Sequence, residues 1–134
     1  MRSHVEFRSP SLLDARADDD APRGKSVAAL LAERLPARGY QIIRVEPEDW
    51  GWRIDLANAA FPLWIGCGHY AEYPDCHLCF IEPSQPHIRR WLKRVATSDV
   101  VEPLATAIEA VLLDDAQVSD LRWWTDAEIE LGTR

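Results

Sequence analysis

The fold is decided by residues 40–69, which read YQIIRVEPEDWGWRIDLANAAFPLWIGCGH. Apolar residues alternate with other residues over 50–57 and over 61–69, and this period of two is typical of β-strands. Two further strands are predicted near 40–46 and 76–82. Because the connections between these runs are short, they suit hairpins better than crossovers. The region therefore predicts a meander of antiparallel strands.

Helices are predicted on either side of these strands along the chain. Apolar residues recur at helical spacing over 26–37 and again over 98–112. Another helix is expected between them over 86–95, because Pro86 favours a helix start and Trp91 shares one helical face with other apolar residues. Each helix has one apolar face and one charged face.

These elements predict a single α+β domain over residues 1–134. Strands near His4–Phe7 and Val118–Thr125 complete the order β-α-ββββ-α-α-β, and a loop is expected over 9–25. The sheet should be mainly antiparallel, with five or six strands and three helices chiefly on one face, so that the other face is partly open. The predicted core contains Val27, Leu30, Leu31, Trp52, Ile54, Leu63, Ile65, Phe80, Trp91, Leu104 and Ile108.

Composition limits the cellular setting and the partners. The chain has 134 residues, a net charge of −7 and three cysteines, and it contains no apolar run of the roughly 20 residues that a membrane span needs. The acidic charge opposes nucleic-acid binding, which needs a basic surface. We therefore expect a cytoplasmic protein with reduced thiols and neither nucleic-acid nor membrane association. Abundant Arg and Ala indicate a bacterial source.

The charge is also unevenly distributed along the chain. Residues 97–130 contain nine acids and one base, whereas Arg89, Arg90, Lys93 and Arg94 lie together without an acid. An acidic partner and a basic partner are both compatible with this pattern. The simpler interpretation is that both segments are solvated helix faces.

No cofactor is predicted. The run Arg23-Gly24-Lys25-Ser26 resembles the end of a phosphate-binding loop, but Asp19 stands where the loop requires its first glycine. Enough Cys and His ligands for a zinc ion occur in this region, but they lack the paired spacing usual for zinc sites. They are Cys67, His69, Cys76, His77 and Cys79. We therefore expect no bound metal, and we expect chelators to leave the fold intact.

A Cys/His-rich site is the alternative to a binding surface. Cys67 and His69 share one strand face, which would place a thiol nucleophile beside a base, and Cys79 lies in the next strand. The simpler interpretation is that Cys67 fills the core as a small apolar residue. Because no complete catalytic motif occurs, the sequence favours a protein that is not an enzyme.

The candidate binding residues are Arg53, Trp64 and His77. Arg53 and Trp64 have the opposite parity to the predicted core residues of their strands, so both should project from the open sheet face. His77 would join them if Leu78 and Phe80 face the core. Such a trio would hold an anionic or carboxylate-bearing group. In the simpler interpretation, Arg53 pairs with Asp55 or another acid and a loop covers Trp64.

Residues 47–52 and 62–68, PEDWGW and PLWIGCG, resemble segments of small uncharacterised bacterial α+β proteins. The resemblance implies no activity and assigns no functional residue. The leading hypothesis is a non-enzymatic accessory domain that binds a protein or ligand. Bacterial immunity proteins and type III secretion chaperones share its size, acidity and class, although the chaperone element order differs. The alternative is a small enzyme or small-ligand receptor that uses the Cys/His-rich hairpin.

Overall fold

The computed structural model describes residues 1–14, 22–69 and 73–132. The strands are β1 (Arg2–Arg8), β2 (Ile42–Glu48), β3 (Gly51–Leu56), β4 (Leu63–His69), β5 (Cys76–Glu82), β6 (His87–Arg90), β7 (Lys93–Ala96) and β8 (Ser119–Thr125). The α-helices are α1 (Lys25–Arg34), α2 (Ser98–Leu113) and α3 (Asp126–Gly132), and short 3-10 helices span Pro10–Leu12 and Leu35–Arg38.

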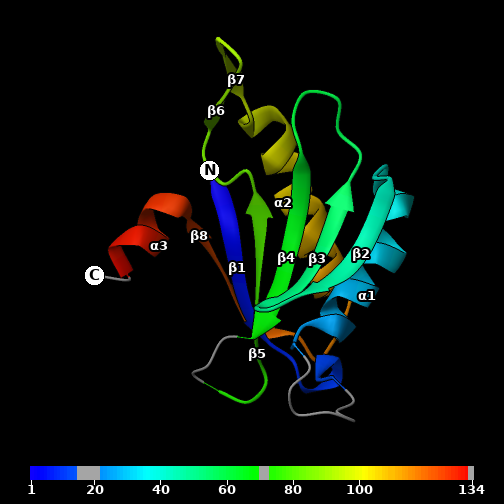
Figure 1. The fold of residues 1–134 in the computed structure, drawn as a ribbon. Coiled ribbons are helices and arrows are strands. Elements are labelled where there is room, and N and C mark those ends of the chain that lie inside the picture. Colours follow the sequence, from blue (N-terminus) through cyan, green and yellow to red (C-terminus); the bar gives the residue numbers. More distant parts are fainter. Residues whose placement is uncertain (15–21, 70–72, 133–134) are drawn as a thin grey trace.

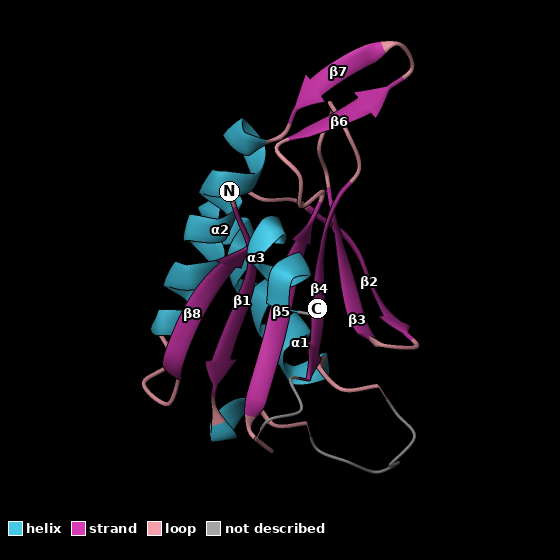
Figure 2. Cartoon of the chain, turned by 90° about the vertical axis from the view of Figure 1, so that its left-hand side faces the viewer, coloured by secondary structure: helices cyan, strands magenta, loops and turns pink. Residues whose placement is uncertain are grey.

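Six strands form one antiparallel sheet in the order β2-β3-β4-β5-β1-β8, while β6 and β7 form a separate hairpin. The α+β class, the antiparallel sheet and the meander of β2 to β5 are thereby confirmed. Helices α1 and α2 pack on one face, and α3 contacts β1 and β8 near the sheet edge (Figures 1 and 2). The opposite face of β3, β4 and β5 is therefore not covered by the two long helices.

The core lies between the sheet and helices α1 and α2. Alternate residues of β3 and β4 point into it, as the period of two predicts, and both helices contribute their apolar faces. Its fully buried side chains include Phe7, Leu31, Ile54, Ile65, Ile81, Leu104 and Ile108. Burial of side chains of this size contributes roughly 1.5–3 kcal/mol each.

The segment that the sequence predicts as a second helix is instead the β6–β7 hairpin. Ile88 lies opposite Val95 and both are half-buried, so their spacing reflects strand pairing. The prediction that Trp91 belongs to the core is wrong, because Trp91 and Leu92 form the hairpin tip and are each 96% exposed. In so short a run, apolar spacing does not distinguish a helix from a hairpin.

The predicted orientation of β5 also requires correction. Cys79 and Ile81 point into the core, whereas Phe80 lies on the opposite face. Apolar residues occupy both parities of this strand, so alternation alone does not identify its core face. The change in orientation decides where the aromatic side chains of the open face lie.

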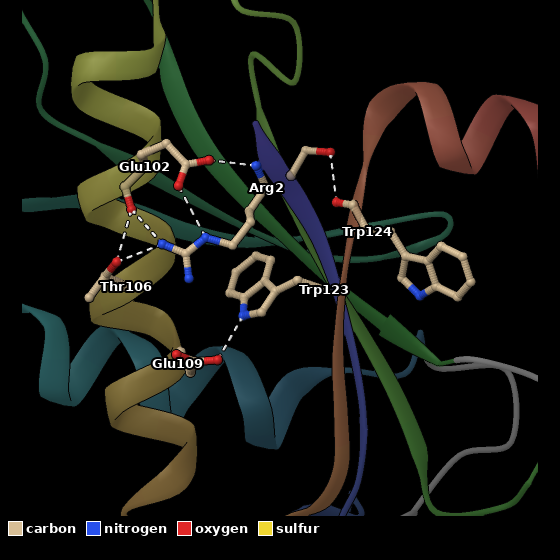
Figure 3. Close-up of polar contacts among 7 residues, drawn as sticks. Arg2, Glu102, Thr106, Glu109, Trp123 and Trp124 are labelled. Carbon is tan, nitrogen blue, oxygen red and sulfur yellow. Dashed lines mark hydrogen bonds and ion pairs between the residues drawn. The ribbon is translucent and has the colours of Figure 1, made fainter.

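The N-terminal strand is fastened to α2 by Arg2 (Figure 3). The backbone N and the Nε of Arg2 donate to the Glu102 carboxylate at 2.6 and 3.1 Å, and its Nη2 donates to Thr106 Oγ1 at 2.7 Å. The guanidinium also lies 5.4 Å from the centre of the Trp123 ring, whose Nε1 donates to Glu109. These contacts join β1, β8 and α2.

Candidate binding site on the open sheet face

Arg53 and Trp64 lie together on the open face, as the parity of their strands predicts. The guanidinium carbon of Arg53 is 4.1 Å from the centre of the Trp64 ring. Arg53 Nε also donates to Asp55 Oδ1 at 2.9 Å, and Arg44 lies 3.3 Å from the other oxygen of that carboxylate. Because Asp55 compensates its charge, Arg53 is better suited to fixing the tryptophan ring than to binding a free anion.

Trp64 is one of three aromatic residues that pack together on this face. Its ring centre is 5.9 Å from that of Trp50 and 5.5 Å from that of Phe80, and the rings of Trp50 and Phe80 are 5.3 Å apart. The tilted and edge-on arrangements suit the charge distribution of aromatic rings. Trp50 remains 45% exposed, so the cluster presents an apolar surface to solvent.

The cluster borders a cavity of about 280 Å³, which we call the aromatic groove. Its lining residues are Trp50, Trp64, Gly68, His69, Leu78 and Phe80. Leu78 lies directly opposite Gly68 in the ladder between β4 and β5, so it faces a position without a side chain. The groove is therefore walled by aromatic rings and by the leucine.

Gly66 lets the Phe80 ring lie across the backbone of β4. A Cβ atom at position 66 would come within 2.3 Å of Phe80 Cζ, far inside normal contact distance. The two residues are directly opposite in the β4–β5 ladder. Gly66 and Gly68, at alternate positions after Trp64, were the signal in the sequence that could have indicated the groove.

His77 does not join Arg53 and Trp64, because β5 presents its odd-numbered residues to the helical face. The imidazole is buried and lies 5.2 Å from the ring of Phe7. Its Nε2–H donates to the carbonyl of Ser9 at 3.0 Å. Burial lowers the pKa of His77, so the neutral form fits this position. The expected trio is thus reduced to the pair, with Trp50, Leu78 and Phe80 completing the site.

The cysteines Cys67 and Cys79 are buried core residues. Their Sγ atoms are 3.7 Å apart, and contact with the Cys79 thiol together with burial raises the pKa of Cys67 well above its ordinary value. A thiolate nucleophile is therefore disfavoured at Cys67. His69 Nε2 lies instead near the carbonyl of Tyr73, at 3.2 Å.

A second cavity of about 200 Å³ lies at the start of α1. It contains His69 and His77 but neither cysteine, and Asp14, Arg23 and Gly24 contribute to its lining. Within the described parts of the chain, no group of three or more His, Cys, Asp or Glu side chains is arranged to hold a metal ion. Of the residues of the proposed Cys/His-rich site, the histidines therefore line a cavity, whereas the thiols of Cys67 and Cys79 do not.

Asp14 in this cavity holds the start of α1. Its carboxylate accepts hydrogen bonds from the backbone N–H groups of Gly24 and Ser26 at 2.9 and 2.7 Å. Burial raises the pKa of Asp14, but these hydrogen bonds outweigh that effect and the pKa is lowered overall. The run that resembles a phosphate-binding loop therefore directs its amides at a carboxylate of the same chain.

Comparisons with protein-family models, with curated proteins and with solved structures found no match. Among the described residues, no helix is both long and apolar enough to cross a membrane.

Proposed function

We propose that this protein is a non-enzymatic accessory domain that binds a partner protein with the open face of its sheet. The observation that carries the proposal is the aromatic groove, which combines the exposed ring of Trp50 and two half-buried rings with a charge-compensated arginine on a face that the long helices leave uncovered (Figure 1). Trp, Tyr and Arg dominate the energetically important positions of protein interfaces.

The size of the groove is compatible with a side chain of a partner. Sites for drug-sized ligands usually have volumes of roughly 300–1,000 Å³. The groove, at about 280 Å³, falls just below that range and fits one large apolar or aromatic side chain.

A partner-binding role agrees with the acidic charge of the chain and with its class. Immunity proteins and secretion chaperones, which act by binding another protein, are functional classes with which the proposal is compatible by analogy. The buried thiols at Cys67 and Cys79 give an enzymatic role no comparable support.

Affinity capture from a lysate of the native host tests the proposal. Trp64→Ala and Trp50→Ala should each weaken the captured complex about 30-fold, which corresponds to roughly 2 kcal/mol for an important interface residue. Trp91→Ala is the matched control, because this tryptophan is 96% exposed and lies on the β6–β7 hairpin. Circular dichroism should show that all three variants keep the fold.

Two results would contradict the proposal. One is a partner that is captured equally by the wild-type protein and by both groove variants. The other is native mass spectrometry that finds a small molecule, and no protein, bound with the same dependence on Trp50 and Trp64.

A further inference from the structure

The β6–β7 hairpin projects beyond the end of the main sheet (Figure 2). Two exposed apolar residues form its tip. Trp91 and Leu92 are each 96% exposed and form the two-residue connection between Arg90 and Lys93. Apolar side chains this exposed contribute no burial of apolar surface to the stability of the fold. Their position indicates contact with something outside the chain.

Four cations surround the base of this tip. Arg90 lies opposite Lys93, and Arg89 lies opposite Arg94. Adjacent positions of a strand point to opposite faces, so one pair lies on each face of the hairpin. We call the two pairs the cationic collar. It encircles the hairpin directly behind Trp91.

The collar is electrostatically unfavourable in the free protein. Like charges that lie directly opposite in a ladder destabilise it, and here two successive pairs are both cationic. Among the described residues, no carboxylate forms an ion pair with any of the four. Arg90 donates instead to the carbonyl of Ala60, and Arg94 Nη2 lies 3.3 Å from His87 Nδ1. An anionic partner would remove this repulsion.

The tip also has an unfavourable backbone conformation. Trp91 has a φ of 58°, in the left-handed region that favours glycine at this position of a two-residue hairpin connection. A side chain makes this conformation less favourable than it is for glycine, and the exposed Trp91 ring does not offset that loss within the protein. The residue type is therefore better explained by an external contact than by stability.

We propose that the hairpin docks on the surface of an anionic lipid bilayer, with Trp91 and Leu92 inserted at the headgroup boundary and the cationic collar at the lipid phosphates. Tryptophan and basic residues together are characteristic of this boundary. Peripheral docking of this kind needs no membrane-spanning segment, and it departs from the expectation, drawn from the lack of a long apolar run, that the protein does not associate with membranes. It is independent of the aromatic groove and goes beyond the proposed partner binding.

The arrangement of charges favours a bilayer over other anionic surfaces. A flat acidic protein surface would meet one face of the hairpin and leave the pair on the other face unsatisfied. Lipid headgroups surround an inserted tip, so they reach both pairs. Nucleic acid would satisfy the cations, but the apolar pair at the extreme tip matches a hydrocarbon boundary better than a polar groove.

Flotation with vesicles tests the proposal on the full chain. The wild-type protein should bind vesicles of phosphatidylserine and phosphatidylcholine, bind weakly or not at all to phosphatidylcholine alone, and dissociate as salt is raised. Arg89→Gln with Arg94→Gln should lower the partition coefficient about 30-fold, because each cation near an anionic bilayer contributes about 1 kcal/mol. Trp91→Ala with Leu92→Ala should lower it at least about tenfold.

A control variant removes the same charge elsewhere. Arg34→Gln with Arg38→Gln neutralises two exposed cations at the end of α1 and in the following turn, and it should bind as the wild type does. The folded state of each variant is checked by its thermal transition. Groove variants such as Trp64→Ala should also bind normally, which separates this test from that of the proposed function.

The inference is overturned if the folded wild-type protein does not bind the anionic vesicles, or if the control variant loses as much binding as the collar variant. Unchanged binding after truncation of Trp91 and Leu92 would also overturn it, because attraction would then be purely ionic. Tighter, collar-dependent binding to a short DNA duplex or to polyglutamate would assign the hairpin to a nucleic acid or an acidic protein instead.

Discussion

The Arg53 guanidinium stacks 4.1 Å from the centre of the Trp64 ring while its Nε donates to Asp55. Asp55 therefore fixes the position of the guanidinium, and the guanidinium in turn limits rotation of the indole. The sequence of contacts from Asp55 to Arg53 to Trp64 explains why a half-buried tryptophan on an open sheet face forms a fixed wall of the aromatic groove. It also explains why the arginine is not available as a free anion site.

Gly66→Ala should disrupt the aromatic groove. The added Cβ would lie 2.3 Å from Phe80 Cζ, so the ring must move away from β4 and from Trp50 and Trp64. We expect a loss of about 1–3 kcal/mol in the free energy of unfolding and a change in tryptophan fluorescence. Urea titration and emission spectra measure both quantities.

The control for this change is a second substitution, at Phe80, whose ring would clash with the added methyl group. Phe80→Leu combined with Gly66→Ala should recover part of the lost stability, because a shorter side chain leaves room for the methyl group. Additive losses in the double variant would show that the two residues do not interact as the structure describes.

Ile54→Asp and Leu104→Asp should each abolish cooperative unfolding at ordinary temperature. Both side chains have no exposed surface, and a carboxylate there would be buried without a partner. Circular dichroism and thermal melts provide the measurement. Ile43→Asp is the control, since this residue is 60% exposed and its replacement should change the free energy of unfolding by less than about 1 kcal/mol. Normal melting of both core variants would contradict the packing.

Alkylation should distinguish the buried thiols from reactive ones. Cys67, Cys76 and Cys79 are all buried, and the pKa of Cys67 is raised well above its ordinary value by the neighbouring thiol and by burial. Iodoacetamide should therefore modify the native protein at least about a hundredfold more slowly than the unfolded protein. Mass spectrometry of the intact chain measures the rates. Rapid modification of Cys67 in the native protein would revive the nucleophile hypothesis.

Stability should fall as the pH drops through the titration range of histidine. Burial lowers the pKa of His77, while the hydrogen bond to Ser9 and the charge of Asp14 oppose this shift less strongly. Burial also lowers the pKa of His4. The unfolded chain therefore binds more protons than the folded one just below the ordinary pKa of 6.5. Stability is fully present above this pH and decreases below it.

Urea midpoints between neutral and mildly acidic pH measure this dependence. His77→Gln should make the decline shallower, because glutamine keeps an N–H group for the Ser9 carbonyl but does not titrate. The pH dependence of stability that remains in this variant is due in part to His4. A wild-type stability that rises on acidification would contradict the sign of both shifts.

The local sequence predicted those parts of the fold in which the spacing of apolar residues was compatible with one arrangement only. Strict alternation in β3 and β4 identified the buried side of Ile54 and Ile65 and, by exclusion, the open side of Arg53 and Trp64. It did not identify Phe80 as a groove residue, because β5 is apolar at both parities. Of the three clustered aromatic residues, the alternation therefore predicted only Trp64, because Trp50 has the parity of Ile54 but lies in the turn before β3 and packs on the open face.

The sequence by itself determined the α+β class, the antiparallel meander and the helices α1 and α2, because each follows from a local period and local turn chemistry. Only the tertiary structure decided that residues 87–96 form a hairpin, that β5 turns His77 inward and that Phe80 reaches Trp50. Each of these depends on which apolar surface a neighbouring element covers. That choice is made by packing between segments far apart in the chain, and it leaves no periodic signal in the residues themselves.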